Sequence, residues 1–430
     1  MQIAVIGAGV IGLSCARELV REGAQVTVID AGSLAGAATP PSAGWICPAL
    51  AAPLAGPGLP SAIAGQIAHG RAAFGIRPSP PGQLVSWLWR FARSGTAAQE
   101  RAGTRALVEL ARDSVAAYED LAAATGLDLQ RKGLVLAARE RRSLDGAAAM
   151  LASVRASGYP GDFDILDRAA ALALDPALAP DVAGAVHARE EVHLRPEELT
   201  EVLGRELDGR CRRVAAHVRG IDRIGGGGGA AGRWEVRTGS ETITADRVVV
   251  AAGVWSRRLL ADLGVRVPLL GGVGHTVTAE GTGTLPSHPM KLVEANTAIA
   301  PFGTRLRVAA RFELAGPGDR ASARSVRAAL RSIRPYLRDW APTGSRVVSE
   351  GLRPATPDSL PLIGAVPGAD GVFAATGHGM LGLTLAPGTA RALAPLVLGA
   401  PAPEVLDPFS LDRFSRGGNR ARPATATGRR

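Results

Sequence analysis

The stretch IAVIGAGVIGLSCARELV, residues 3–20, decides the fold because it places Gly7, Gly9 and Gly12 at the spacing G-x-G-x-x-G. The apolar run before the glycines predicts a buried parallel strand, and the residues after them carry apolar side chains at helical spacing. The first glycine permits a tight bend, the second lets the backbone approach a pyrophosphate, and the third lets the helix lie close to the strand. The helix N-terminus would then offer free N–H groups to phosphates.

A second strand is predicted over residues 25–29, and it ends at Asp30, which lies 18 residues after Gly12. An acid at this place meets a ribose hydroxyl in dinucleotide-binding folds. The order strand, glycine turn, helix, strand and acid predicts a bound ADP-containing dinucleotide, although an ordinary glycine-rich turn of an α/β sheet is the alternative. The motif does not distinguish NAD from FAD.

Cysteine usage indicates a reducing compartment. The three cysteines, Cys15, Cys47 and Cys211, show no pairing pattern and no C-x-x-C motif, so we expect neither a zinc site nor another metal site. Because the first strand begins at the N-terminus, no cleaved signal peptide is expected. A cytoplasmic location is predicted, and peripheral contact with the inner face of the membrane is left open.

The net charge of +10 raises the question of nucleic acid. Only two of the 49 basic residues are lysines, Lys132 and Lys291, and the arginines are spread along the chain. Residues 415–430 hold five arginines and no acid, which indicates a disordered tail. This distribution is typical of a coding bias, so we expect no nucleic-acid partner.

Two stretches without charge have the length of a membrane span. Residues 31–70 are interrupted by six prolines, and residues 371–390 by five glycines, a histidine and a proline, whereas a spanning helix needs about 20 unbroken apolar residues. We predict a loop for the first stretch and a strand, a turn and a helix for the second. The aromatic cluster Trp87, Trp89 and Phe91 fits a membrane surface or, as we expect, a packed core.

Apolar periodicity predicts four helices after the first βαβ unit. They are expected at residues 83–95, 104–126, 147–158 and 194–207. The glycine-rich run 224–232 predicts the tip of a hairpin, and short antiparallel strands are expected between residues 268 and 311.

The C-terminal stretch favours a flavin over a nicotinamide. Residues 372–398 predict an apolar strand, a turn with the sequence HGMLG, and a helix that rises from about Leu383. A helix N-terminus beside the cofactor would stabilise the negative charge that a reduced flavin carries near N1 and C2=O. A reduced nicotinamide has no such charge.

These motifs together resemble those of the FAD-dependent D-amino acid oxidase superfamily, and within it those of the bacterial D-amino acid dehydrogenase branch. Four stretches carry the resemblance, which extends across nearly the whole chain: IAVIGAGVIGLSCARELVREGAQVTVID, VVVAAGVWS, SEGLRPATPDSLPLIG and ATGHGMLGLTLAPGTARALAPLVLG. It implies an α/β fold in which an FAD-binding Rossmann-like domain of the glutathione-reductase type is interleaved with an α+β substrate domain built on an antiparallel sheet.

The resemblance and the order of elements predict a discontinuous organisation. The FAD-binding domain would comprise residues 1–80, 190–260 and 345–412. The substrate domain would comprise residues 81–189 and 261–344, followed by a disordered basic tail at residues 413–430.

The resemblance also implies which residues would hold FAD. The ADP half would lie against Gly7, Ala8, Gly9, Val10, Ile11, Gly12 and Asp30, with Val218 at the adenine and Ala252 and Gly253 at the turn after the middle strand. The pyrophosphate and the flavin would be lined by Ser42, Ala43 and Gly44, and the flavin ring by Gly377, Gly379, Met380, Leu381, Gly382 and Thr384.

Arg353, in the motif GLRP, matches the arginine that grips the substrate carboxylate in amino-acid-oxidising relatives. Independently of any family, a guanidinium pairs with a carboxylate through two charge-assisted bonds, although a structural ion pair is the alternative in so arginine-rich a chain. His378 lies in the flavin motif, and His275 matches a position that faces the substrate cavity. For both histidines, a catalytic role competes with simple packing.

The implied enzyme is an FAD-dependent oxidoreductase that deaminates an amino acid by hydride transfer from Cα to flavin N5. A D-amino acid is the expected substrate. Water would hydrolyse the imino acid to a 2-oxo acid, and the electrons would pass to a quinone or another carrier. Such a reaction requires orientation and electrostatics from the protein. The alternatives are an oxygen-using oxidase of glycine, sarcosine or another secondary amine, and a dehydrogenase of a cyclic imino acid such as a hydroxyproline.

The chain departs from the family pattern at positions that bear on the substrate. Ser349 and Glu350 stand where an aromatic residue usually precedes GLRP, and Ala309 and Ala310 replace a pair of glycines. None of the three tyrosines falls in the predicted substrate strands. These departures leave the substrate more open than the flavin.

Overall fold

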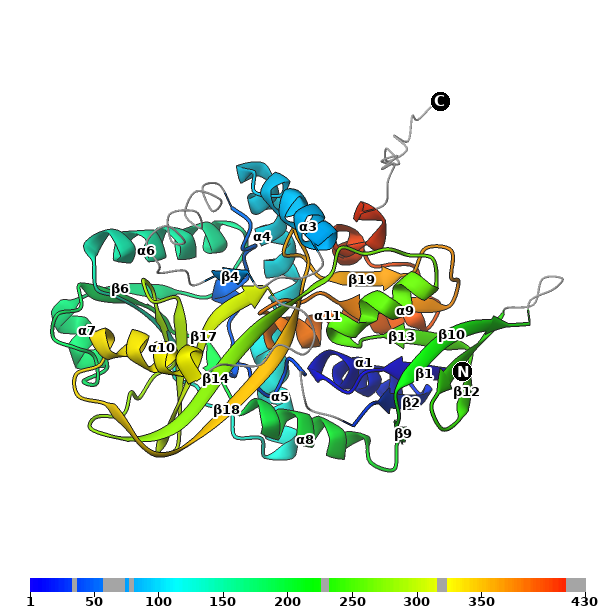
Figure 1. Ribbon diagram of the computed structural model, residues 1–430, viewed down its shortest axis with the longest axis horizontal. Helices are drawn as coiled ribbons and strands as arrows, with labels where there is room; N and C mark the ends of the chain where they lie inside the picture. Colours follow the sequence, from blue (N-terminus) through cyan, green and yellow to red (C-terminus); the bar gives the residue numbers. More distant parts are fainter. Residues whose placement is uncertain (33–36, 57–73, 77–80, 226–231, 315–322, 415–430) are drawn as a thin grey trace, which may run out of the picture.

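The computed structural model describes residues 1–32, 37–56, 74–76, 81–225, 232–314 and 323–414 of the chain. Two halves lie side by side in Figure 1, each built around a sheet of its own. The predicted combination of a Rossmann-like unit with a second, largely antiparallel sheet is confirmed.

The first half is built on a six-stranded sheet with the order β19-β20-β13-β1-β2-β9. The strands are β1 (Gln2–Ile6), β2 (Gln25–Asp30), β9 (Arg212–Ala215), β13 (Arg247–Val250), β19 (Leu362–Ala365) and β20 (Val372–Thr376). All are parallel except β19, which pairs antiparallel with β20 at the edge. The sheet therefore combines strands from the beginning, the middle and the end of the chain.

Both faces of this sheet are covered, which explains why its strands are apolar without alternation. Ile3 and Val5 pack on the side of α1 (Val10–Arg21), α8 (Pro196–Leu207) and α11 (Gly382–Val397). Ala4 and Ile6 pack on the side of α9 (Ser256–Asp262) and a small sheet.

The small sheet consists of β10 (Val218–Ile224), β11 (Arg233–Thr238) and β12 (Thr242–Ala245). Strands β10 and β11 pair antiparallel, as the glycine-rich run predicts. Residues 226–231 of that run lie outside the described residues.

The second half is built on a nine-stranded sheet with the order β18-β14-β17-β16-β15-β5-β7-β6, in which β4 also pairs with β17. The strands are β4 (Phe74–Ile76), β5 (Leu134–Ala138), β6 (Phe163–Asp167), β7 (Gly184–Ala188), β14 (Leu270–Thr282), β15 (Met290–Leu292), β16 (Thr297–Phe302), β17 (Arg305–Leu314) and β18 (Ala341–Ala355). Its pairing is mostly antiparallel, as predicted, but β14 and β18 have 13 and 15 residues and are not short. In Figure 1 these two strands run along the junction of the halves.

The predicted boundary at residue 345 falls within β18. Strand β4, which lies in the stretch 1–80 predicted for the FAD-binding domain, pairs with β17 of the nine-stranded sheet. The domain limits therefore remain a proposal.

The remaining helices surround the nine-stranded sheet and the junction (Figure 1). They are α3 (Pro81–Arg93), α4 (Ala97–Ala111), α5 (Ser114–Thr125), α6 (Arg141–Ala156), α7 (Arg168–Leu174) and α10 (Ala323–Ile333). Helix α6 begins earlier than the predicted residue 147, and α8 begins with Pro196 in its first turn, as predicted.

The single helix predicted for residues 104–126 is wrong, because the chain breaks there into α4 and α5. The break brings α5 against the start of α11. The Ser114 hydroxyl donates to the Thr384 carbonyl, and the Tyr118 hydroxyl donates to the Leu383 carbonyl at 2.8 Å. These contacts between distant parts of the chain override a helical pattern that contains no internal breaker.

The aromatic cluster of α3 is divided between core and surface. Trp87 is 5% exposed and donates its ring N–H to the Ala355 carbonyl at 3.3 Å, as a packed core requires. Trp89 is 59% exposed, so the core prediction is wrong for that residue. Within the described residues we find no helix that combines the length and the apolar character needed to cross a membrane.

Candidate active site

The predicted cofactor residues meet at one edge of the six-stranded sheet. Gly7 follows β1, Asp30 ends β2, Ala252 and Gly253 follow β13, and Gly377 follows β20. Because these strands are parallel neighbours, their carboxyl ends lie at the same edge. This is where open α/β sheets bind their ligands.

The glycine loop has the geometry that its spacing predicts. A Cβ on Gly7 would lie 2.4 Å from the Ala251 carbonyl oxygen, and a Cβ on Gly12 would lie 1.9 Å from the Gly7 carbonyl oxygen. Both positions therefore require glycine for close backbone packing. At Gly9 the nearest atom would be the Thr39 hydroxyl at 3.6 Å, which leaves room for a phosphate group to approach.

Asp30 holds this loop and still has capacity for a ligand. Its carboxylate accepts N–H bonds from Ala8 at 2.7 Å and from Gly32 at 2.9 Å. A carboxylate has about four acceptor positions, so a ribose hydroxyl can still bind. The Ala216 N–H donates to the Asp30 carbonyl at 2.7 Å, which brings Val218 near the same strand end.

A cavity of about 370 Å³ continues from this edge to the nine-stranded sheet. It has the size of a small-molecule site. The predicted residues that line it are Ser42, Ala43, Gly44, Arg353, Gly377, His378, Gly379, Met380, Leu381 and Thr384. Gly382 and the ADP-side residues do not line this cavity.

The wall of the cavity contains buried polar groups that have no hydrogen-bond partner in the described part of the protein and could bind a polar ring system. Among the described residues, the buried Ser42 hydroxyl and the Trp45 ring N–H have no hydrogen-bond partner. Gly44 has φ +82°, and a Cβ there would lie 2.0 Å from the Leu194 carbonyl oxygen. The residues present therefore fit FAD, whose ADP half would lie at the glycine loop and whose flavin would lie in the cavity.

The start of α11 completes this wall. The helix begins at Gly382, directly after the cavity-lining turn. The Thr384 hydroxyl accepts the Cys47 N–H at 3.0 Å and thereby ties the helix to the loop after Gly44. A helix N-terminus at this place would stabilise negative charge on a bound flavin.

Arg353 extends from β18 across the neighbouring strand into the cavity. A Cβ on Gly274 of β14 would lie 2.4 Å from its Cζ atom, so the side chain needs this glycine beneath it. Burial lowers the pKa of Arg353 to about 10. Burial is the one cause of this shift, and no carboxylate of the described residues contributes to it. The planar fork of Arg353 can therefore pair with a carboxylate ligand.

The two predicted histidines occupy different positions. His378 lines the cavity, but its Nε2 atom lies 3.0 Å from the Thr389 hydroxyl, and burial lowers its pKa to about 3. It is therefore neutral at ordinary pH. His275 is buried in β14 and is not among the described residues that line the cavity. Catalytic roles for both remain predictions.

Sequence reasoning missed Lys291 of β15, which lines the cavity and donates a hydrogen bond to the Asn296 side chain. Burial and the charge of Arg353 lower the pKa of Lys291 to about 8. One signal could have drawn attention to this residue, because lysine is rare in a chain whose basic residues are nearly all arginines.

A buried acid lies behind the same wall. Glu191 is 1% exposed and accepts hydrogen bonds from the Tyr159 hydroxyl at 2.6 Å and the Ala49 N–H at 3.2 Å. Burial raises its pKa to about 7. Burial and the neighbouring Glu191 also raise the pKa of the cavity-lining Cys47, which makes this thiol a poor nucleophile.

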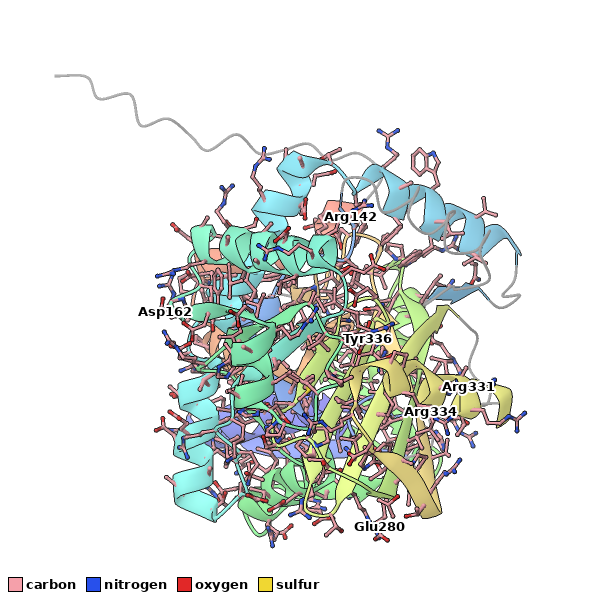
Figure 2. All side chains as sticks on the ribbon, turned by 90° about the vertical axis from the view of Figure 1, so that its left-hand side faces the viewer. Arg142, Asp162, Glu280, Arg331, Arg334 and Tyr336 are labelled. Carbon is pink, nitrogen blue, oxygen red and sulfur yellow. The ribbon has the colours of Figure 1, made fainter. Side chains whose placement is uncertain are left out.

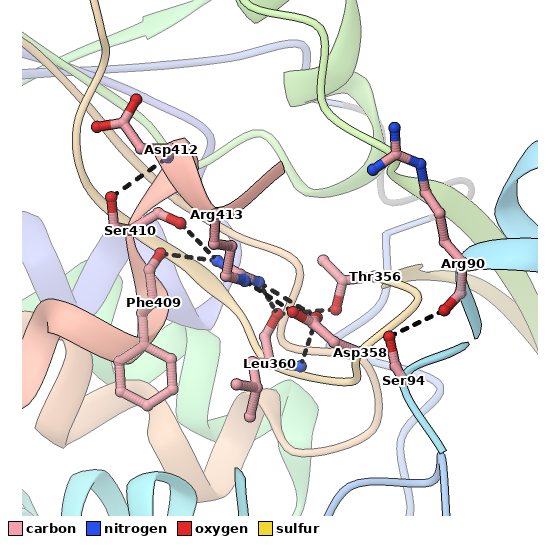
Figure 3. Close-up of polar contacts among 9 residues, drawn as sticks. All are labelled: Arg90, Ser94, Thr356, Asp358, Leu360, Phe409, Ser410, Asp412 and Arg413. Atoms are coloured by element: carbon pink, nitrogen blue, oxygen red, sulfur yellow. Dashed lines mark hydrogen bonds and ion pairs between the residues drawn. The ribbon is translucent and has the colours of Figure 1, made fainter. Parts of the chain in front are cut away.

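The loop between β18 and β19 closes another part of the cavity, through Thr356 and Ser359. Figure 3 shows how the segment that contains Arg413 holds this loop. Arg413 donates to the Leu360 carbonyl at 2.7 Å and forms an ion pair with Asp358. The Thr356 hydroxyl donates to the same carbonyl at 2.7 Å.

Comparison with known proteins identifies relatives along the full chain. A family model described as DAO, FAD dependent oxidoreductase, matches residues 2–396. The D-amino acid dehydrogenase of Cereibacter sphaeroides is 34% identical over 435 residues, covering 99% of this chain and 98% of that protein. D-amino acid dehydrogenase 2 of Pseudomonas aeruginosa is 34% identical and covers 91% of this chain and 94% of that protein.

A solved structure agrees with the fold. Glycine oxidase from Geobacillus kaustophilus superposes with a TM-score of 0.72 at 23% identity, over 96% of this chain and 99% of that chain. At this identity the likeness supports the architecture alone.

Proposed function

Because the chain belongs to the DAO family of FAD-dependent oxidoreductases, we propose that it dehydrogenates a D-amino acid and passes the electrons to a quinone or another carrier. FAD is the cofactor of this family and supplies the hydride acceptor when bound. The choice of a D-amino acid follows the two relatives at 34% identity that carry this activity in their names.

The observation that carries the proposal is the placement of Arg353. Its guanidinium lies in the cavity above Gly274, and the turn at Gly377–Met380 lines the same cavity. A carboxylate held by this fork through two charge-assisted bonds would be fixed in orientation relative to the turn. The apolar part of the wall, including Trp87, would lie beside the rest of the substrate.

The proposal requires little acid–base chemistry from side chains. His378 is neutral and already bonded to Thr389. In this proposal the substrate enters with its amine deprotonated, and the protein contributes position and electrostatics.

Helix α3 supports a quinone acceptor at a membrane surface. Trp87, Leu88 and Phe91 of this helix line the cavity, while Val85 and Trp89 are 65% and 59% exposed. Peripheral contact through this helix would bring a membrane quinone close to the site. Co-sedimentation with anionic vesicles, lost in a Trp89→Ser variant, would support this part of the proposal.

The deciding experiment is anaerobic bleaching of the purified yellow protein by a panel of D-, L- and N-substituted amino acids. We expect D-amino acids to reduce the flavin and a quinone dye to reoxidise it faster than air does. Reduction by L-amino acids alone would contradict the proposed chirality. Faster reoxidation by air would favour an oxygen-using amine oxidase.

A further inference from the structure

The nine-stranded sheet forms a floor of small residues between two cations. Lys291 of β15 pairs with Ala298 of β16, which in turn pairs with Ala309 of β17. Paired residues of neighbouring strands share one face of a sheet. The next strand, β14, brings Gly274 beneath the Arg353 guanidinium. Both cations and both alanines line the cavity.

The two cations stand at opposite sides of this floor. Strand β15 is three steps from β14 in the sheet, so the two strands lie about 14 Å apart at the usual strand spacing. The lysine side chain reduces the gap between the charges, and the charge of Arg353 is felt at Lys291, where it contributes to a lower pKa. Small residues leave the space between them open.

Neither cation has an acidic partner within the part of the chain that the structure describes. Lys291 donates to the amide oxygen of Asn296, and Arg353 lies above Gly274. No Asp or Glu is among the described residues that line the cavity.

The acid nearest to Lys291 in the sequence is Glu294, and it forms hydrogen bonds with other groups. Glu294 accepts the Tyr336 hydroxyl at 2.7 Å and the N–H groups of Arg139 and Glu140 at 3.0 Å each. The Tyr336 oxygen also accepts the Ala295 N–H at 3.1 Å. In Figure 2, Tyr336 lies among the packed side chains, whereas the charged residues Glu280 and Arg331 lie at the edge of the view. The turn that presents Asn296 is thus held in place.

Two partly buried positive charges that line one cavity without an acid are costly, and a ligand that supplies both missing charges offsets this cost. A substrate with one carboxylate would satisfy only Arg353. The side chain of such a substrate would leave Lys291 with the neutral Asn296 amide as its partner and without an anion.

We propose that the substrate carries a second carboxylate, which Lys291 and Asn296 bind while Arg353 holds the α-carboxylate. This inference rests on the proposed function, because it names the substrate class of the same site. The second carboxylate lies on the side chain, as in D-glutamate and D-aspartate, or on the amine nitrogen, as in iminodiacetate.

The first test compares matched substrates with the holoenzyme, by anaerobic flavin reduction. We expect kcat/KM for D-glutamate and D-aspartate to exceed that for D-glutamine and D-asparagine by about 10-fold or more, since each pair differs only in the distal charge. A comparison of iminodiacetate with sarcosine tests whether the second carboxylate can be carried by the amine nitrogen. Equal values within all three pairs would overturn the inference and leave the proposed function standing.

Ligands that cannot be oxidised test the binding of a second carboxylate independently of the reaction. Glutarate is expected to perturb the flavin absorbance at a concentration about 10-fold lower than butyrate does. If no amino acid reduces the flavin, the proposed function fails, but tighter binding of glutarate would still support two anion positions. Equal binding of glutarate and butyrate would contradict them.

Variants of the two lysines locate the preference. Lys291→Met is expected to reduce the preference for D-glutamate over D-glutamine by about 10-fold, and Lys291→Arg to retain most of it. Lys132→Met, which removes the other lysine at an exposed site, is the matched control and should leave the preference unchanged. If Lys291→Met shifts the flavin midpoint potential and slows both substrates equally, the lysine serves the cofactor and the inference is wrong.

Discussion

Arg413 and Asp358 form an ion pair, with Nε and Oδ2 2.7 Å apart, that ties the short helix Leu411–Phe414 to the loop closing the cavity (Figure 3). Both side chains are less than one-fifth exposed, at 17% and 19%. The guanidinium also donates to the carbonyls of Phe409 and Ser410 at 2.9 Å each. The segment that contains Arg413 therefore supports the position of the loop.

Arg413→Met should lower the free energy of unfolding by about 2 kcal/mol, because it leaves a partly buried carboxylate and several carbonyls unpaired. It should also raise KM, since the loop contributes Thr356 and Ser359 to the cavity. Urea unfolding and steady-state kinetics measure the two effects. Arg112→Met, which removes a half-exposed pair with Glu109, is the control and should change stability by less than about 0.5 kcal/mol.

Gly12→Ala should abolish FAD binding, because its Cβ would lie 1.9 Å from the Gly7 carbonyl oxygen and displace the loop. The purified variant is expected to be colourless and to stay so after incubation with excess FAD. Gly146→Ala in α6 is the matched control, since no atom lies within 4 Å of the added Cβ. It should bind FAD normally and be stabilised by about 0.5–1 kcal/mol. A yellow Gly12→Ala variant would refute the proposed place of the ADP half.

Arg353→Met should lower kcat/KM for flavin reduction by about 100-fold or more, because the substrate carboxylate loses both charge-assisted bonds. Arg353→Lys should recover only part of this loss, since an ammonium cannot form the planar pair. Stopped-flow measurement of flavin reduction at varied substrate concentration gives kcat/KM and KM for each variant. An unchanged KM in the Met variant would show that the carboxylate binds elsewhere.

Glu191 is expected to make stability depend on pH. Burial raises the pKa of its carboxyl to about 7 in the folded protein, above the ordinary value of 4.5. The folded state therefore holds a proton that the unfolded state releases, so this contribution is full below about pH 4.5 and is lost as pH rises through about 7. The shift corresponds to about 3 kcal/mol.

Glu191→Gln should flatten the fall in Tm between about pH 5 and pH 8, because an amide does not titrate. It can still accept the bonds from Tyr159 and Ala49. Glu190→Gln, at the exposed neighbouring position, should retain the slope of the unmodified protein. An unaltered slope in Glu191→Gln would show that other groups cause the pH dependence.

The first βαβ unit could be predicted from the sequence because its determinants are local. The spacing of Gly7, Gly9 and Gly12 sets the turn, and the contacts of each missing Cβ explain it. The strand, turn and helix at the C-terminal end were predicted for the same reason.

Elements that depend on distant contacts were predicted less well. No glycine or proline marks the break between α4 and α5, which is stabilised by bonds from Ser114 and Tyr118 to α11. Trp89 follows the same pattern as Trp87, yet only the latter finds a partner in β18.

In the candidate site, too, residues placed by contacts between distant parts of the chain could not be predicted. Arg353 was selected by its motif, whereas Lys291 reaches the cavity only through the pairing of β15 with β16 and β5. A register shift at Gly274 and His275 affects the pairing of β14 with β17. The register of β14 with β18 is continuous here, so His275 points to the face opposite to Gly274, which lies beneath Arg353. The sequence alone did not show which face of this strand would meet the cavity.

The strand order of the six-stranded sheet has a consequence for biosynthesis. Strand β20 leaves the ribosome after more than 370 residues, yet it must pair with β13 beside the strand that was translated first. The six-stranded sheet of the nascent polypeptide therefore lacks one of its strands through most of translation. Because the turn after β20 belongs to the edge where the prosthetic group would bind, we expect this edge to be complete only after nearly the whole chain has been translated.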